Sequence, residues 1–415
     1  MATAAIVDAY SVGRHLPGAF ARAGAEVVHV QSTPDFLPGV PPPDLSPYAA
    51  NVVHTTPEQT AARLGELGVV CVVPGQETGV PLADLLSERL GLPGNGSALS
   101  RARRDKYDMI ETLRSAGLHC ARQLKSHDVD ELVAWADSNG YPVVVKPLSS
   151  ASTDGVSICH DAVQLRKASE ALLGTLDIFQ SRNSEVLVQS YLDGVEYVVD
   201  AVCAGGRPHI CGVWRYDKTD VGTTRIYDRE ILLAPRDEPV AALVGYLCGV
   251  LEALGIGFGA AHAEIMMTSS GPALVEIGAR LNGSMDPGFH DVCLDGNQAD
   301  LLARSYTRPR EPAPSHPGVT VYRKRCEALL CNTQSRQDGI VDAIDEDVLA
   351  QIRDLDTVYG VLPRVGVGGR IRPTTDLLSS PLRVFLAGER ADQVMADYHR
   401  VLALKDKVYR LKDLT

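Results

Sequence analysis

The segment that most constrains this 415-residue chain runs from residue 259 to residue 286 and reads GAAHAEIMMTSSGPALVEIGARLNGSMD. Two apolar runs, residues 260–267 and 272–277, flank a turn of Thr, Ser, Ser and Gly. Apolar runs joined by such a turn predict an antiparallel hairpin. Each run carries one carboxylate, Glu264 or Glu276, and paired strands can place both on one face.

Two carboxylates on one face, Glu264 and Glu276, repel each other unless a cation lies between them, and Mg²⁺ favours such hard oxygen ligands. Arg280 and Asn282 follow the second run. Metal-binding carboxylates followed by a guanidinium and an amide form a set suited to polyphosphate chemistry. The alternative is structural, with Glu264 facing water at a sheet edge and Arg280 as its salt-bridge partner.

The motif H-A-E followed by V-E-I-G-A-R-L-N-G resembles the metal-binding end of the ATP-grasp superfamily, and more narrowly its L-amino acid ligase branch of dipeptide-forming carboxylate–amine ligases. Many ATP-grasp enzymes have E-x-N at the second carboxylate, whereas here Glu276 is followed by Ile277 and Gly278. The E-x-G-x-R variant is associated with the dipeptide-ligase branch. The resemblance implies that Glu264 and Glu276 hold one or two Mg²⁺ ions, with Mn²⁺ as an alternative. It leaves open whether Gly278 changes the metal stoichiometry.

The domain organisation follows from length and from this resemblance. A chain of 415 residues is too long for one compact core. Strand–helix alternation in residues 1–98 predicts an open parallel α/β domain. The resemblance implies an ATP-grasp domain over residues 99–310, with a small lobe at about 120–192 and a metal-binding lobe at about 193–310. A lid-like α+β domain over 311–415 completes the predicted fold, which is α/β in class.

The C-terminal region offers local signals only. Residues 309–317 are rich in proline and predict a linker, and residues 361–372 (VLPRVGVGGRIR) predict a Gly-rich hairpin. No catalytic set of residues is evident beyond residue 310.

Two further segments resemble the ATP-binding parts of the superfamily. The sequence R-x-K-x-x-M at residues 104–109 lies in a helix predicted from about residue 100 to 116, and implies that Lys106 reaches the ATP phosphates. The structural alternative is a solvated helix lysine. The apolar run YPVVVKP predicts a strand that ends in Lys146.

The loop at residues 148–156 (LSSASTDGV) resembles the flexible loop that ATP-grasp proteins fold over the ATP phosphates. Small residues let backbone N–H groups approach a phosphate closely. The ATP-binding candidates in this loop are Ser150, Ser152 and Gly155. As an ordinary hairpin turn, the loop would need no functional explanation.

Residues 185–200 predict two strands broken at an Asp-Gly pair. The resemblance implies an interlobe hinge that binds adenine through backbone groups, followed by the sequence G-x-E-Y. The hinge candidates are Gln189, Tyr191 and Leu192. Glu196 matches the acid after the hinge and is a candidate for ribose or nearby polar contacts, with a cross-strand charge partner as the alternative.

Glu77 follows the third predicted strand of the N-terminal domain, at the carboxyl edge where open parallel sheets bind ligands. It is a candidate for holding a substrate amino group, and equally for a helix N-terminal acid stabilised by the helix dipole. The other substrate candidates lie in the polar segment 214–233 or after the second carboxylate; they are Lys218, Arg225, Tyr227, Arg280 and Asn282.

Composition limits which binding partners and which cellular compartment we expect for this chain. The net charge of −12 argues against a nucleic-acid binder and against an anionic-membrane binder. Nine dispersed cysteines without C-x-x-C indicate reduced thiols in a cytoplasmic protein. No apolar stretch is long enough to span a bilayer, and the first residues lack a signal-peptide pattern. The resemblance makes a homodimer one option for the oligomeric state.

Together these residues predict an ATP-dependent ligase for two small molecules, a carboxylate and an amine. The carboxylate is activated as an acyl phosphate and attacked by the amine, giving a peptide or amide bond, ADP and phosphate. Lys106 and Lys146 would hold the phosphates, while Arg280, with Lys146, would stabilise charge on the transferring phosphoryl group. The alternatives are a carboxylase- or formyl-type ATP-grasp enzyme, and an ATP-binding protein without catalysis.

Overall fold

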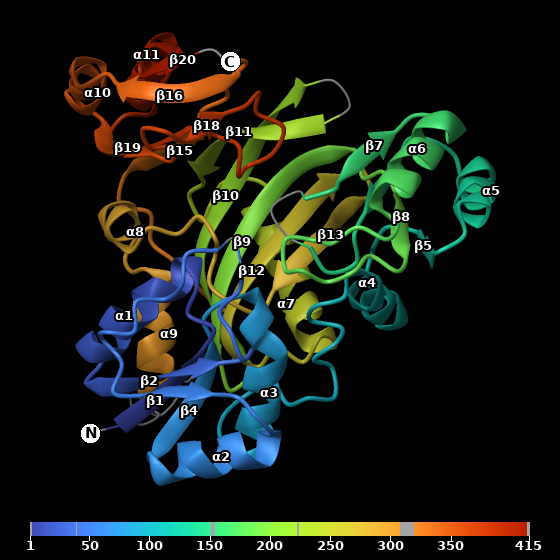
Figure 1. Ribbon diagram of the computed structural model, residues 1–415, viewed down its shortest axis with the longest axis vertical. Coiled ribbons are helices and arrows are strands. Elements are labelled where there is room, and N and C mark those ends of the chain that lie inside the picture. The colour runs from blue at the N-terminus through green and yellow to red at the C-terminus, as the bar shows by residue number, and fades with distance from the viewer. Residues whose placement is uncertain (1, 39, 151–153, 222–223, 308–318, 413–415) are drawn as a thin grey trace.

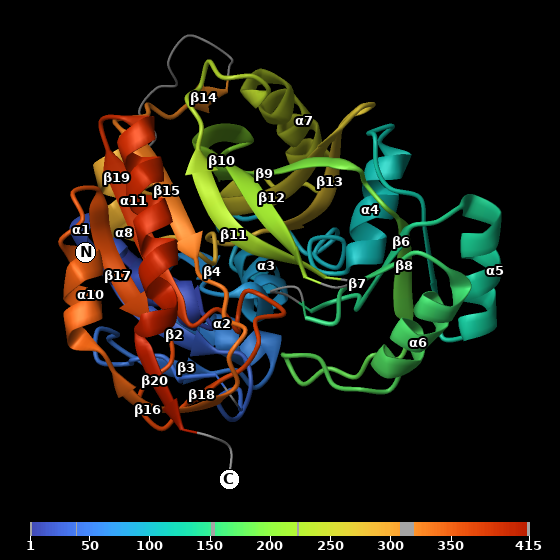
Figure 2. The same ribbon diagram turned by 90° about the horizontal axis from the view of Figure 1, so that it is seen from above.

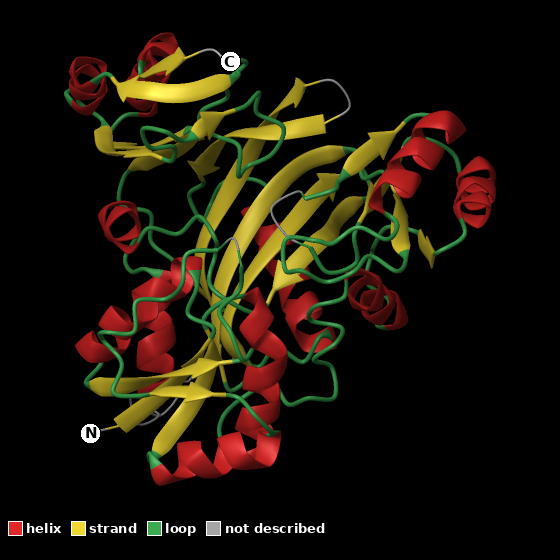
Figure 3. Cartoon of the chain, in the orientation of Figure 1, coloured by secondary structure: helices red, strands yellow, loops and turns green. Residues whose placement is uncertain are grey.

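The computed structural model describes residues 2–38, 40–150, 154–221, 224–307 and 319–412. Side chains are described for these residues except 220, 221, 224 and 225. Within these ranges the strands form four sheets. Long strands of one central sheet run through the middle of the molecule, and most helices lie towards its periphery (Figures 1 and 3). The proline-rich linker predicted at 309–317 lies outside the described residues.

The N-terminal unit is a parallel sheet with the strand order β3–β2–β1–β4, as the strand–helix alternation predicts. Alternate residues of β1 enter different cores: Ala4 and Ile6 pack with helix α1, and Ala5 and Val7 pack with helices α2 and α3. Both faces of the sheet are therefore covered by helices, which explains its continuous apolar strands. The elements are β1 (Ala2–Val7), η1 (Ser11–His15), α1 (Leu16–Arg22), β2 (Ala25–Gln31), β3 (Asn51–Val53), α2 (Pro57–Glu66), β4 (Val69–Pro74), η2 (Glu77–Gly79) and α3 (Val80–Arg89).

The small lobe is an antiparallel sheet with the order β5–β8–β6–β7, which packs against helices α5 and α6. Helix α4, which leads into it, begins at Lys106 and not near residue 100 as predicted. The Asp105 carboxylate caps it by accepting the backbone N–H groups of Tyr107 and Asp108. The elements are α4 (Lys106–Ser115), β5 (Gln123–Ser126), α5 (Val129–Asn139), β6 (Val143–Lys146), β7 (Ser157–Cys159), α6 (Ala162–Leu172) and β8 (Val186–Ser190).

The central sheet has the order β13–β12–β9–β10–β11–β15–β19–β17, and β14 pairs with β10. Helix α7 packs against the apolar face of the long strands β9, β10, β12 and β13 and forms the largest core with them. The opposite face is left to carry polar groups. The elements are β9 (Gly194–Ala204), β10 (Arg207–Val221), β11 (Thr224–Leu232), α7 (Val240–Ala253), β12 (Phe258–Thr268), β13 (Gly271–Gly278), α8 (Pro287–Cys293), α9 (Gln298–Thr307) and β14 (Thr320–Val321).

The C-terminal region continues the central sheet through β15, β19 and β17 and adds a small sheet of order β18–β16–β20. The hairpin predicted at residues 361–372 is wrong, because β17 pairs with β19 and β18 pairs with β16. The elements are β15 (Glu327–Asn332), β16 (Gly339–Ile344), α10 (Glu346–Arg353), β17 (Val358–Pro363), β18 (Arg370–Ile371), β19 (Leu382–Gly388), α11 (Ala391–Leu404), η3 (Lys405–Lys407) and β20 (Tyr409–Lys412).

Candidate active site

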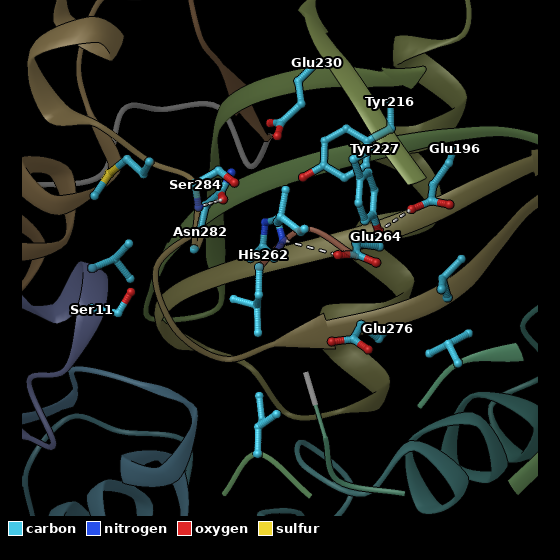
Figure 4. Close-up of a pocket in the computed structure, with 18 of the residues that line it drawn as sticks. Ser11, Glu196, Tyr216, Tyr227, Glu230, His262, Glu264, Glu276, Asn282 and Ser284 are labelled. Atoms are coloured by element: carbon cyan, nitrogen blue, oxygen red, sulfur yellow. Dashed lines mark hydrogen bonds and ion pairs between the residues drawn. The ribbon is translucent and has the colours of Figure 1, made fainter. Parts of the chain in front are cut away.

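The two carboxylates of the predicted hairpin lie directly opposite each other. Strands β12 and β13 pair antiparallel, with Glu264 opposite Glu276. Because directly opposed residues of an antiparallel pair project to the same face, both side chains point towards the same space (Figure 4). The prediction of a hairpin with both carboxylates on one face is confirmed.

The neighbouring strands extend this polar face. Side chains two residues apart on a strand share a face, so Glu196 on β9 and Tyr216 on β10 lie on the side of Glu264 (Figure 4). Lys218 on β10 reaches the same side, where it binds Glu196. These residues line a cavity of about 1330 Å³ that reaches from the small lobe to the C-terminal region. A volume of this order accommodates a nucleotide together with small substrates.

Most of the predicted site residues meet at this cavity. Those that line it are Lys106, Lys146, Gln189, Tyr191, Leu192, Glu196, Lys218, Tyr227, Glu264, Glu276, Arg280 and Asn282. Glu77, Ser150 and Gly155 are not among its lining residues. Ser152 and the side chain of Arg225 lie outside what the structure describes.

Two buried lysines lie next to the carboxylate pair. Lys106 Nζ is 3.1 Å from the Glu276 carboxylate and donates a hydrogen bond to the Ser150 carbonyl oxygen. Among the described residues, Lys146 Nζ has no hydrogen bond or ion pair. Burial, followed by the charge of Lys106, lowers the pKa of Lys146 to about 8, although Glu276 and Glu264 favour its charged form. A buried cation in this position is suited to an anionic ligand such as a phosphate.

The loop after β6 is shaped by its small residues. Ser150 Oγ donates to the Asp154 carboxylate at 2.6 Å. Gly155 has a φ of +67°, and a Cβ there would lie 2.5 Å from Leu172 Cδ2. Glycine is therefore required to turn the chain here. The proposed contacts of this loop with ATP stay predictions.

The hinge candidates occupy the junction between β8 and β9. The Gln189 side chain donates to Gln123 Oε1 at 2.8 Å across the sheet. The Ser190 N–H donates to the Arg122 carbonyl, and Ser190 Oγ accepts from the Arg122 N–H. Because these side chains serve the sheet, recognition of adenine here would use backbone groups.

Glu196 is the centre of a second charged group. It accepts from Lys218 Nζ at 2.6 Å and from the Tyr227 hydroxyl at 3.3 Å. The Lys218 ammonium also lies 4.3 Å from the centre of the Tyr227 ring. Burial raises the pKa of Glu196, and the charge of Lys218 opposes that rise. In this structure Lys218 and Tyr227 contact Glu196, so Glu196 is the charge partner of Lys218 on the neighbouring strand.

A histidine and an aspartate that the sequence did not single out complete this face. His262 Nδ1 lies 2.8 Å from Asp200 Oδ1, and its Nε2 lies 3.7 Å from Glu264. Burial disfavours the imidazolium, but Asp200 and Glu264 outweigh burial and raise the pKa of His262 to about 9. The Asn282 amide donates to Asp200 at 2.8 Å. The signal for His262 was its place two residues before Glu264, whereas Asp200 is found only from strand register.

Arg280 is held by an acid from the N-terminal domain. Its Nε donates to Glu77 Oε2 at 2.7 Å, and Arg104 binds the other Glu77 oxygen at 2.8 Å. Burial opposes ionisation of Glu77, but the two guanidinium groups prevail and lower its pKa to about 2. A substrate ammonium would have to compete with two arginines for Glu77, so its predicted role as an amino-group ligand stays a prediction without support from this geometry.

The same pair explains the glycine in the E-x-G-x-R motif. A Cβ at Gly278 would lie 3.0 Å from Glu77 Oε2 and 3.1 Å from Arg280 Cζ. These distances leave no room for an asparagine unless the Glu77–Arg280 pair moves. The space that an Asn ligand would use is therefore occupied by this ion pair.

The donor set fits magnesium only together with a nucleotide. In the described residues, no group of three or more His, Cys, Asp and Glu side chains could hold a metal ion by itself. Magnesium in phosphoryl-transfer sites is bound by one or two carboxylates together with substrate phosphates and water. Glu264 and Glu276 beside Lys146 provide the protein's share of such a site.

Comparison with known proteins places these features in a family. Residues 139–287 match the family model of the ATP-grasp domain. Dapdiamide A synthase of Enterobacter agglomerans is 36% identical over 383 residues, which cover 91% of this chain and 89% of that protein. The L-amino acid ligase of Bacillus licheniformis has the same fold, with a TM-score of 0.77 and 20% identity over 100% of this chain and 99% of the other. N5-carboxyaminoimidazole synthetase of Staphylococcus aureus with ADP has a TM-score of 0.68 and 15% identity, over 97% of this chain and 98% of that one.

Proposed function

The chain belongs to the amino acid ligase branch of the ATP-grasp family of ATP-dependent carboxylate–amine ligases, and on this premise we propose that it joins two amino acids. The observation that carries the proposal is the opposed pair Glu264 and Glu276 beside two buried lysines on one cavity wall. The similarity to dapdiamide A synthase over nearly the whole chain favours amide formation over carboxylation.

The proposed reaction has two steps. A carboxylate oxygen of the first substrate attacks the γ-phosphorus of ATP, giving an acyl phosphate and ADP. The amine of the second substrate then attacks the acyl carbon, and phosphate leaves as the amide bond forms. Magnesium held by Glu264 and Glu276 would supply charge neutralisation at the phosphates, as one or two ions.

The residues of this chain bind and orient the phosphates. Lys146 and Lys106 extend from the small lobe and from α4 towards the carboxylate pair, where their ammonium groups would bind phosphate oxygens. Ser150, Ser152 and Gly155 would close the loop over the phosphates. Gln189, Tyr191, Leu192 and Glu196 would line the nucleoside end of the cavity.

Arg280 is the group best placed to stabilise charge on the transferring phosphoryl group and on the tetrahedral intermediate. Glu77 and the Leu281 carbonyl hold its Nε and Nη1, and in the described residues nothing binds its Nη2. The free N–H groups can therefore face the cavity in a fixed direction. We assign Glu77 to positioning Arg280, and we keep Lys218, Arg225, Tyr227 and Asn282 as candidates near the substrates.

The decisive experiment measures phosphate release with ATP and Mg²⁺ across all pairs of the twenty amino acids, with mass spectrometry of the products. Release that depends on a pair, with a product mass equal to the sum of both less water, would establish the ligase and name its substrates. Release without any such product, or none with any pair, would contradict the proposal that both substrates are standard amino acids.

We further propose that the protein works in a reducing compartment. None of the helices in the described residues is long and apolar enough to cross a membrane. All nine cysteines are free, which supports a reducing compartment such as the cytoplasm. The oligomeric state, with a homodimer as the option, stays a prediction.

A further inference from the structure

Three arginines at one end of the cavity have no role in the phosphate chemistry. Arg14 lies in η1, Arg364 follows β17 and Arg383 lies in β19, and all three line the cavity. Figure 2 shows β17, β19 and α1, which follows η1, on one side of the molecule, and β6 on the other. Lys146 is the last residue of β6. The arginines are therefore separated from the residues that bind ATP.

These guanidinium groups keep most of their hydrogen-bond donors free. Arg383 Nε donates to Asn332 Oδ1 at 2.9 Å, and Arg364 Nη1 donates to the Leu377 carbonyl oxygen. Arg14 donates no hydrogen bond within the described part of the chain, and no carboxylate there forms an ion pair with any of the three. Each arginine can offer at least one further pair of N–H groups to a ligand.

The three like charges also influence one another. Burial lowers the pKa of Arg383, Glu230 and Tyr216 oppose this shift, and the charge of Arg14 adds to it. Burial and then the charge of Arg383 lower the pKa of Arg364. An anion that binds between the partly buried Arg364 and Arg383 and the exposed Arg14 would stabilise all three charges.

In the described residues no acid forms an ion pair with these arginines, although the charge of Glu230 favours the charged form of Arg383. Glu230 is separated from Arg383 by Asn332, whose amide donates to Glu230 at 3.4 Å and accepts from Arg383. Burial raises the pKa of Glu230 to about 7, so its negative charge is disfavoured. Asp376 favours the charged form of Arg364, but its influence on the pKa of Arg364 is smaller than that of Arg383.

We propose that Arg14, Arg364 and Arg383 bind a substrate carboxylate that is not activated and that stays free in the product. Planar guanidinium groups match a carboxylate in a two-point arrangement. This inference rests on the proposed ligase function. In a dipeptide the free group is the α-carboxylate of the amine donor, and a second carboxylate on the acyl donor is the other source of the same chemistry.

An α-carboxamide separates these two sources, because it cannot be phosphorylated and can react only as the amine donor. The experiment compares kcat/KM for amino acids and for their α-carboxamides as amine donors, with each productive acyl donor. The wild-type protein should prefer the acid by about tenfold or more, as expected for a charge-assisted hydrogen bond. Arg383→Gln should bring this preference close to one and leave the KM for ATP unchanged.

Two further variants control for folding. Arg14→Gln breaks no hydrogen bond or ion pair with the residues that the structure describes, and should weaken the acid preference in the same direction. Arg353→Gln removes an exposed arginine of α10 that pairs only with Glu346 in the described residues, and should keep wild-type values.

The KM values and the acid preference of these variants show which substrate carries the bound carboxylate, and they test the subsite separately from the ligase function. If the KM of the acyl donor rises in both Arg14→Gln and Arg383→Gln while the acid preference persists, the carboxylate belongs to the acyl donor. If both variants keep the acid preference and both KM values, the arginine subsite is overturned while the ligase function stands. A wild-type protein that ligates no pair of standard amino acids would overturn the proposal that it joins two amino acids, and with it the assignment of this subsite to an amino acid carboxylate.

Discussion

Glu77 and Arg280 form a buried ion pair of 2.7 Å between residues 203 positions apart. Glu77 lies in η2, after strand β4 of the N-terminal sheet, and Arg280 lies in the segment after β13. Arg104 binds the remaining oxygen of Glu77. This contact fixes the proposed phosphoryl-binding guanidinium against a second domain. It also explains why Gly278 stands where many relatives in the superfamily have Asn.

The first prediction concerns this pair. Glu77→Ala leaves the buried Arg280 and the partly buried Arg104 without their acid, and breaking a buried pair in this way costs about 3–5 kcal/mol. We expect a lower melting temperature and a lower kcat in phosphate release, with a smaller change in the KM for ATP. Glu66→Ala, which removes an exposed partner of Arg63, should change stability by about 0.5 kcal/mol or less.

A different result would restore the other role of Glu77. If Glu77→Ala unfolds like the wild-type protein, and only the KM of the amino substrate rises, Glu77 holds the substrate amino group directly.

The second prediction concerns the metal carboxylates. Glu264→Gln and Glu276→Gln keep the shape of each side chain and remove its charge. We expect kcat to fall by about a hundredfold or more, because a bound metal contributes several kcal/mol to transition-state stabilisation. A Mg²⁺ titration of phosphate release measures this, with Glu252→Gln on the exposed side of α7 as the control. An unchanged Mg²⁺ dependence in either variant would remove that residue from the metal site.

The third prediction tests the reason for glycine at residue 278. Gly278→Asn restores the residue of many relatives, but its Cβ would lie 3.0 Å from the Glu77 carboxylate. The variant should therefore be less stable and less active, and should not gain Mg²⁺ affinity. Gly245→Ala, where a Cβ meets open space, is the matched control. Tighter Mg²⁺ binding with normal stability in Gly278→Asn would show that the ion pair can move to admit a ligand.

The fourth prediction concerns ATP binding. Lys146→Ala removes a buried cation next to the carboxylate pair, and the loss of a charged hydrogen bond of about 1.5–3 kcal/mol corresponds to tenfold weaker binding or more. Calorimetry with Mg²⁺ and ATP measures the Kd. Lys167→Ala, an exposed lysine of α6 in the same lobe, should leave it unchanged. An equal Kd in wild-type protein and Lys146→Ala would place the phosphates elsewhere.

The fifth prediction uses the buried carboxyl group of Glu230. Its environment is formed by Arg383 on β19, His262 on β12, Asp200 on β9, Asn332 on β15 and Tyr216 on β10. Burial raises the pKa of Glu230 from 4.5 to about 7, so the folded state holds this proton more tightly than the unfolded state. The contribution to stability is complete below pH 4.5 and is lost as the pH rises through 7.

The loss amounts to about 3 kcal/mol of unfolding free energy between those limits. Glu230→Gln cannot titrate and should lack this component. The urea concentration at the unfolding midpoint should therefore decrease more between pH 5 and pH 8 in the wild-type protein than in Glu230→Gln. Glu346→Gln, an exposed change on α10, should follow the wild-type protein. Parallel pH dependence of Glu230→Gln and wild type would show that Glu230 ionises normally.

Much of the site could be predicted from the sequence because the patterns that specify it involve residues close together in the chain. The apolar runs around a Ser/Gly turn predicted the β12–β13 hairpin, and strand alternation then placed Glu264 and Glu276 on one face. Strand–helix alternation predicted the parallel sheet of the N-terminal domain for the same reason. The hairpin expected at residues 361–372 failed because glycine-rich turns do not specify which strands pair.

The sequence by itself determined the local elements, the carboxylate pair and the motif that places the chain in its family. Only the tertiary structure showed that Asp200 binds His262, that Glu77 holds Arg280, and that Arg14 and Arg383 line the same cavity. These contacts depend on strand register and on the packing of segments hundreds of residues apart. Side-chain patterns encode periods of two and 3.6 residues, and they carry no record of which distant surfaces will meet.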